Sequence, residues 1–160
     1  PSRRNRGFMP ESPPDQPTLN PIGTAHTPWK RGHCPKNMNA ARASGEPAHL
    51  TIDAAVRPGL LGLERASHII ILGWFGNVDR NVLLQYPSHL PREFGCFALR
   101  TPARPNPIAL SIAKIAALNT AAGRIDLDAL DWFDGTPVLD LKPYFASTDA
   151  IPDARIADPS

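Results

Sequence analysis

The sequence holds two cysteines in 160 residues, Cys34 and Cys96, and neither belongs to a Cys-x-x-Cys pair. This scarcity excludes a disulfide-stapled scaffold and a zinc knuckle, and it is typical of the reducing cytoplasm. His33 beside Cys34 would supply only half of a metal site, and no second such pair follows. We therefore expect a cytoplasmic protein without a metal.

Long apolar runs are also missing. The longest, His68–Phe75, has the length of a strand, whereas a membrane-spanning helix needs about 20 apolar residues. The basic N-terminus is not followed by an apolar segment. We expect neither a signal peptide nor a membrane partner.

Three common enzyme motifs are absent. The chain has no Gly-x-Gly-x-x-Gly after a strand, no phosphate-binding loop and no Gly-x-Ser-x-Gly. These absences exclude a Rossmann cofactor site, a P-loop enzyme and an α/β-hydrolase. Aromatic residues make up 7%, which offers few platforms for stacking RNA bases.

Proline, in contrast, is abundant. Nineteen prolines disfavour long helices, because an internal proline removes a hydrogen bond and clashes with the preceding turn. Alternation of apolar and polar residues predicts short strands. The predicted strands are 22–27, 49–53, 69–75, 82–86, 96–101, 124–128 and 138–144, whereas 108–118 fits either a strand or a helix. We expect a mainly β domain, a barrel, with short helical turns and long loops.

The predicted organisation is simple. Residues 1–20 form a flexible Arg- and Pro-rich arm, residues 21–146 form the folded domain with a long loop at 28–47, and residues 147–160 form a polar tail. Basic residues dominate before residue 118 and acidic residues after it. This asymmetry fits an anionic ligand on one side or two complementary faces.

Two clusters carry candidate chemistry. In residues 100–107, Arg-Thr-Pro-Ala-Arg-Pro-Asn-Pro, prolines fix the backbone around Asn106, and Arg100 and Arg104 offer planar forks for carboxylate or phosphate. In residues 130–137, Leu-Asp-Trp-Phe-Asp-Gly-Thr-Pro, Asp131 and two aromatics surround a tight turn and would suit a flat cationic ligand. The alternatives are a rigid connection with surface arginines and a turn flanked by core aromatics.

Together with Cys34-Pro-Lys-Asn37, Ile22-Gly-Thr and residues 62–68, these clusters resemble the TsaA-like (TrmO) family over about residues 22–145. The resemblance implies a single-sheet, non-Rossmann β-barrel that binds S-adenosylmethionine. It also implies a homodimer that methylates the exocyclic amine of threonylcarbamoyl-adenosine next to the tRNA anticodon.

The resemblance also implies site residues. Those expected to bind the cofactor are Pro35, Lys36, Asn37, Gly76, Asn77, Arg100, Leu110, Leu130 and Asp131. Arg104 and Asn106 are expected to bind the substrate. An exocyclic amine is a weak nucleophile, so a proton acceptor should help; Asp134 is the first candidate, with Lys142 and Tyr144 nearby in the sequence.

The chain departs from better-known members at three places. Phe75-Gly-Asn77 replaces a His or Asp followed by Gln, and Cys34-Pro-Lys-Asn37 replaces Pro-Arg-Gln. Longer members carry an extra C-terminal domain thought to hold tRNA, and this chain is expected to lack it. Two alternatives remain: the same cofactor with a small-molecule or other RNA substrate, and a non-catalytic RNA-binding barrel.

Overall fold

The computed structural model describes residues 16–158, which form two compact units. Asn20–Phe75 and Ile108–Arg155 make the larger unit. Gly76–Pro107 makes the body of the smaller unit, together with residues near the two termini. Residues 16–20 are irregular and exposed, and the rest of the predicted N-terminal arm lies outside the described residues.

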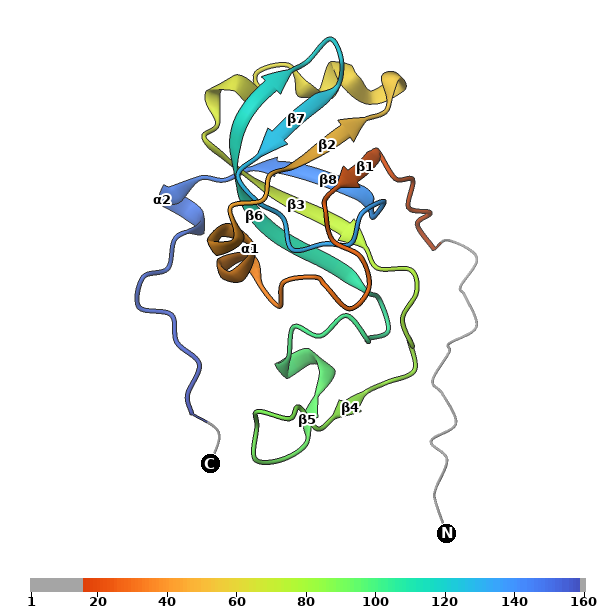
Figure 1. Cartoon of the computed structure of the whole chain (residues 1–160), viewed down its shortest axis with the longest axis vertical. Helices are drawn as coiled ribbons and strands as arrows, with labels where there is room; N and C mark the ends of the chain where they lie inside the picture. Colours follow the sequence, from red (N-terminus) through yellow and green to blue (C-terminus); the bar gives the residue numbers. More distant parts are fainter. Residues whose placement is uncertain (1–15, 159–160) are drawn as a thin grey trace. The chain divides into compact units, whose positions relative to one another are not determined.

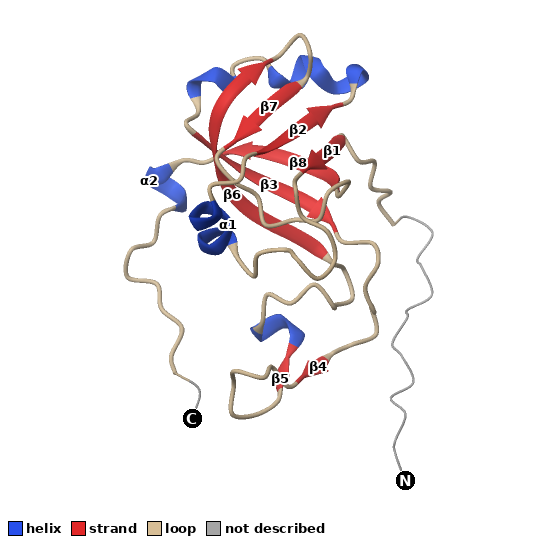
Figure 2. Cartoon of the chain, viewed as in Figure 1, coloured by secondary structure: helices blue, strands red, loops and turns tan. Residues whose placement is uncertain are grey.

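The larger unit is a closed ring of antiparallel strands. Its described strands pair in the order β1-β2-β7-β6-β3-β8, and β8 pairs back with β1 (Figures 1 and 2). Their bounds are Gly23–His26 (β1), Ala48–Ile52 (β2), His68–Trp74 (β3), Ile108–Asn119 (β6), Arg124–Leu127 (β7) and Pro137–Pro143 (β8). The predicted mainly β fold is therefore confirmed, and the predicted strands at these places are present within a few residues.

Strand β6 resolves the ambiguity at residues 108–118. It is a strand of 12 residues, because Ala109, Ser111 and Ala113 alternate inward while Ile108 and Leu110 point outward. Its first half pairs with β3 and its second half with β7, and an irregularity between Ile115 and Ala117 marks the change. A bulge of this kind bends a strand, so one long strand serves two neighbours of the ring.

The core lies inside the ring and consists mainly of aliphatic side chains from alternate strand positions. Its fully buried large members are Leu50, Ile52, Ile69, Ile71, Ile125, Leu127, Leu130, Val138 and Trp132. Trp132 is 2% exposed and meets Phe75 edge-on, with ring centroids 5.7 Å apart. It packs directly on Gly73 of β3, where a side chain would collide with the indole. The glycine therefore makes room for the tryptophan.

Helical segments are short, and two of them correct the sequence-based expectation. Residues 28–47, expected to be a loop, contain helix α1 (Met38–Ser44). Asn37 caps its N-terminus, and Gly45, with a positive φ of 72°, caps its C-terminus. The expected polar tail begins with the helical turn α2 (Ala146–Asp149). Two 3₁₀ segments, η1 (Ala54–Leu60) and η2 (Leu63–Arg65), join β2 to β3.

The smaller unit contains little regular structure. Its strands β4 (Leu84–Gln85) and β5 (Phe94–Gly95) form a two-residue antiparallel ladder. The strand predicted at 96–101 is wrong: the chain there forms the 3₁₀ turn η3 (Cys96–Ala98) and then runs irregularly. Prolines at 102, 105 and 107 lack the N–H group that a sheet ladder requires. Within residues 16–158, every helix is too short or too polar to span a bilayer.

Candidate functional site

The Asp-Gly turn before β8 is held by backbone bonds to β1 and the loop after it. Gly135 has a φ of 83°, the left-handed conformation that favours glycine. Its N–H donates to the carbonyl of Ala25 (2.9 Å), and Asp134 N–H donates to the carbonyl of Trp29 (2.9 Å). The hydroxyl of Thr136 donates to the carbonyl of Phe133 (2.6 Å) and closes the turn from within. The turn predicted at Asp134-Gly135 is confirmed.

Three side chains of the loop after β1 bind the segment at residues 130–132. Trp29 Nε1 donates to the carbonyl of Leu130 (2.8 Å), Cys34 Sγ to that of Asp131 (3.3 Å) and Thr27 Oγ1 to that of Trp132 (2.7 Å). Three consecutive carbonyls are thus taken by one loop. These three bonds fix the loop against the segment that carries Asp131.

The thiol of Cys34 is neutral near physiological pH. Partial burial, and secondly the negative charge of Asp131, raise its pKa to about 11. A thiol is a good nucleophile or metal ligand only as the thiolate, so Cys34 acts here as a weak hydrogen-bond donor. Among the described residues, no group of three His, Cys, Asp or Glu side chains is placed to hold a metal ion.

The carboxylate of Asp131 is half-buried and held from inside the ring. Ser111 Oγ donates to Asp131 Oδ1 (2.9 Å) and accepts from Trp132 Nε1 (2.9 Å). The other oxygen, Oδ2, accepts no hydrogen bond from a described residue. The orientation of this carboxylate is therefore set by Ser111. Residues 27–34, whose side chains bind the 130–132 segment, are called the anchored loop below.

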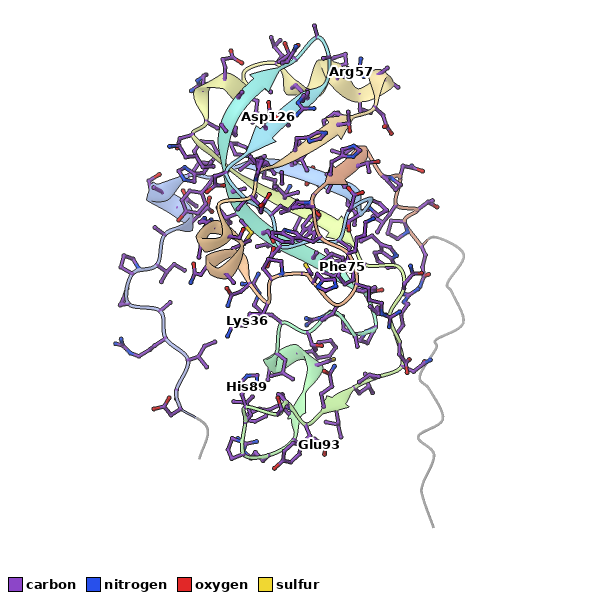
Figure 3. All side chains as sticks on the ribbon, in the orientation of Figure 1. Lys36, Arg57, Phe75, His89, Glu93 and Asp126 are labelled. Atoms are coloured by element: carbon purple, nitrogen blue, oxygen red, sulfur yellow. The ribbon has the colours of Figure 1, made fainter. Side chains whose placement is uncertain are left out.

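Helix α1 positions the segment 35–37. Asn37 Oδ1 caps the helix by accepting from Ala40 N–H (2.9 Å). Arg42 on the same helix donates to Asp128 Oδ2 (3.2 Å) and to the carbonyl of Ile112 on β6 (2.7 Å). These bonds attach α1 to the ring. The side chain of Lys36, which precedes the helix, is exposed and points away from the ring (Figure 3).

A histidine pair lies beside Asp134 on the outer face of β1 and β2. His26 and His49 stack with centroids 4.5 Å apart, and His26 Nε2 contacts the hydroxyl of Thr51. His26 Nδ1 lies 4.0 Å from Asp134 Oδ1, which also accepts from Thr27 N–H (3.1 Å). Desolvation, followed by the charges of Arg124 and His26, lowers the pKa of His49. Asp134 therefore lies beside a histidine pair in which the pKa of His49 is lowered.

The family model described as "tRNA-methyltransferase O N-terminal domain" matches residues 24–150. The chain belongs to this TrmO family. The segment Gly76–Pro107 of the smaller unit lies within these bounds. The resemblance stated from the sequence motifs is confirmed.

The names of three similar proteins fit the same family. A "Probable S-adenosyl-L-methionine-binding protein" of Archaeoglobus fulgidus is 35% identical over 139 residues, which cover 86% of this chain and 37% of that protein. A "tRNA (adenine(37)-N6)-methyltransferase" of Mus musculus is 40% identical over 94 residues, or 57% of this chain and 21% of that one. The crystal structure of TrmO from P. aeruginosa superposes with a TM-score of 0.74 at 30% identity, over 90% of this chain and 62% of that one. The chain thus spans less than two thirds of these three proteins.

The larger unit brings part of the expected TrmO cofactor set together. Pro35, Lys36 and Asn37 lie between the anchored loop and α1, and Asp131 lies on the segment bound by that loop. Leu130 is fully buried, and its carbonyl is taken by Trp29. It is therefore a core residue in this structure.

Leu110, another expected cofactor contact, points outward from β6 and is 45% exposed, whereas its neighbour Ser111 points inward. Adjacent residues of a strand face opposite sides. Leu110 and the Ser111–Asp131 contact therefore lie on different faces of β6.

The expected catalytic residues do not form one cluster within the larger unit. Asp134 precedes β8, whereas Lys142 lies near the other end of that strand, about 17 Å beyond Pro137 in an extended chain. Lys142 Nζ pairs with Asp140 (2.9 Å), and this hydrogen bond and charge raise its pKa. Its ammonium can donate but not accept a proton at neutral pH. Tyr144 follows β8 and donates its backbone N–H to the carbonyl of His68 (3.0 Å).

The remaining expected residues lie in the smaller unit. Arg104 donates from its guanidinium to the carbonyls of Cys96 (3.0 Å), Leu99 (3.2 Å) and Thr101 (3.1 Å). Arg80 donates to the carbonyl of Pro105 (2.7 Å) and to Asn106 Oδ1 (3.2 Å). These bonds fix the Arg-Pro-Asn-Pro segment from within the unit. Further members of the expected set, all exposed, are Gly76, Asn77 and Arg100.

Sequence reasoning missed Ser111, Thr27 and Trp29. Ser111 stands in an alternating row of alanines, and a polar residue at an inward position was the available signal. Thr27 and Trp29 bind carbonyls about a hundred positions away in the chain. Local sequence carries no sign of such contacts.

Proposed function

We propose that the protein is an S-adenosylmethionine-dependent methyltransferase that acts on tRNA at threonylcarbamoyl-adenosine. The observation that carries this proposal is the TrmO family match over residues 24–150, which includes both the anchored loop and the Asp131 segment. The printed names of the relatives supply the cofactor and the tRNA adenine.

The residues around Asp131 suit a cationic cofactor. Asp131 presents a half-buried carboxylate oriented by Ser111, and the thiol of Cys34 is neutral. Pro35, next to Cys34 in the chain, is half-buried. A sulfonium or ammonium group is stabilised by such a carboxylate. When bound, S-adenosylmethionine supplies an activated methyl group.

The chain's own part in the reaction is mainly positioning. Thr27, Trp29 and Cys34 hold the segment 130–132 in place, so Asp131 needs little reorganisation on binding. Preorganised groups and correct orientation account for much of a methyl transfer rate.

We assign proton acceptance to Asp134. Its carboxylate is half-exposed, oriented by Thr27 N–H and adjacent to the His26–His49 pair. Lys142, whose ammonium lies 2.9 Å from Asp140, is a cation suited to the carboxylate or phosphates of the modified nucleotide.

We also propose that the strand ring is the family's single-sheet barrel and that the protein is a homodimer. Ile108 and Leu110, each 45% exposed, lie on the outer face of β6. Exposed apolar side chains grouped on one face mark interaction surfaces. Light scattering at micromolar concentration should report twice the chain mass, and Leu110→Lys should shift it toward the monomer. A wild-type monomer would refute the dimer.

Two measurements test the function. Calorimetry should detect binding of S-adenosylmethionine, and labelled methyl should enter tRNA that carries threonylcarbamoyl-adenosine but not an unmodified transcript. Asp134→Asn should lower turnover while leaving cofactor affinity unchanged. Absence of cofactor binding would refute the methyltransferase. Binding with no methylation of either tRNA would favour another substrate.

A further inference from the structure

A buried hydroxyl inside the strand ring joins two residues of the 130–132 segment. Ser111 is 5% exposed and lies on β6 between the inward-facing Ala109 and Ala113. Its Oγ is 2.9 Å from both Trp132 Nε1 and Asp131 Oδ1. A hydroxyl in an otherwise apolar interior is unfavourable unless it is hydrogen-bonded, and here both of its bonds go to the same short segment.

The direction of these two bonds is fixed by chemistry. An indole N–H can only donate, so Ser111 must accept from Trp132. Its single proton is then free to be donated to Asp131, which as a carboxylate can only accept. The chain Trp132–Ser111–Asp131 therefore has one polarity and one arrangement of protons.

This arrangement fixes the Asp131 carboxylate as well as its backbone. Cys34 holds the carbonyl of Asp131, and Ser111 holds Oδ1, so the side chain cannot rotate without losing a bond to a charged group. Trp132, the other partner of Ser111, is itself packed against Gly73 and Phe75. The orientation of Oδ2 is thus set by the core of the ring.

We propose that Ser111 is a positioning residue that orients the carboxylate of Asp131 toward the cationic cofactor. The inference rests on the proposed function. The inference goes beyond the proposed function because it assigns part of the cofactor affinity to Ser111. This buried residue on β6 acts through Asp131 and not by contact with the ligand.

The test is calorimetric titration with S-adenosylhomocysteine and S-adenosylmethionine. Asp131→Asn should weaken binding of S-adenosylmethionine about ten- to a hundredfold, which is the usual effect of losing an interaction with a charged group. Ser111→Ala should weaken it about three- to tenfold, since the carboxylate must then be ordered on binding. Ser67→Ala removes an exposed hydroxyl beside β3 and serves as the matched control, with no change expected.

A double-mutant cycle separates positioning from a general loss of structure. In the Asp131→Asn background, Ser111→Ala should cause no further loss, because its effect passes through the carboxylate. Ser111→Ala combined with Trp132→Phe also removes the indole N–H that would be left without an acceptor. Because the smaller ring also leaves a cavity in the core, its melting temperature is not the readout; this variant should keep the binding defect of Ser111→Ala.

Each outcome decides between the two claims. Wild-type protein that binds no cofactor refutes the proposed function, and the inference with it. Wild-type binding with a Ser111→Ala affinity equal to that of Ser67→Ala overturns the inference alone. Additive losses in the cycle also overturn it, because they would show that Ser111 acts by stabilising the fold.

Discussion

Replacement of Gly73 by alanine should couple the stability of the ring to the geometry of Asp131. A Cβ at this position would lie 2.6 Å from Trp132 Cη2 and 3.1 Å from the carbonyl of Pro137. Both neighbours are part of packed structure, since Trp132 is 2% exposed and Pro137 begins β8. The indole must therefore shift, and its bond to Ser111 must lengthen or break.

The expected loss of stability has two parts. Overpacking a core costs typically about 1–3 kcal/mol, and leaving a buried donor unsatisfied costs about 1–3 kcal/mol more. For a chain of this size 1 kcal/mol corresponds to about 2–4 °C. We expect Gly73→Ala to melt about 5–15 °C below the wild type and to bind S-adenosylmethionine more weakly.

Thermal unfolding followed by circular dichroism measures the first effect and calorimetry the second. Gly59→Ala is the matched control, because a Cβ there meets nothing within 4 Å. Trp132→Phe removes the indole atoms that Gly73→Ala would strike. The double variant should therefore lose little stability relative to Trp132→Phe alone. Equal melting of Gly73→Ala and Gly59→Ala would show that the Trp132 contact does not constrain β3.

Three further changes test other parts of the structure. Arg100→Ala should weaken S-adenosylmethionine binding about ten- to a hundredfold in calorimetry, and unchanged affinity would remove Arg100 from the site. Arg104→Ala removes the bonds to three carbonyls of the smaller unit; limited proteolysis should then cut within residues 96–104, and wild-type resistance there would contradict its structural role. His49 has a lowered pKa in the folded state, so the unfolded chain binds more protons. The free energy of unfolding should therefore fall as the pH drops below the usual histidine pKa of about 6.5. In denaturant titrations at several pH values, His49→Gln should make this dependence on pH less steep. An unchanged pH dependence would assign it to other groups.

The strands of the ring were predictable because burial on one face leaves a period of two in the sequence. Residues 124–128 and 138–144 alternate clearly, and the structure places β7 and β8 there. Residues 108–118 were ambiguous because alanine suits a helix as well as a packed interior. Only the pairing of β6 with both β3 and β7 decides for the strand.

Helix α1 was missed although its signals are local. Asn37 is a favourable N-cap, Ala40 and Ala41 follow, and Gly45 supplies the left-handed C-terminal residue. A strand was predicted at residues 96–101 where there is none. The apolar residues of this stretch favour a strand, but the prolines that follow it lack the N–H group that a sheet ladder requires. In the structure the carbonyls of this stretch bind Arg104 and not a partner strand.

The candidate site depends on contacts that no local pattern encodes. The family resemblance predicts Asp131 as a cofactor contact, and this stays a prediction. Its carboxylate is oriented by Ser111, 20 residues earlier, and its backbone by Cys34, 97 residues earlier. The first contact exists only because β6 turns Ser111 inward, opposite Ile71 and two residues along β3 from Gly73, on which Trp132 packs. A shift of β6 by one residue would turn Leu110 inward and Ser111 outward. The register of the ring therefore sets the chemistry of Asp131, and this is why a change at Gly73, on the neighbouring strand, should be measurable as a change in cofactor affinity.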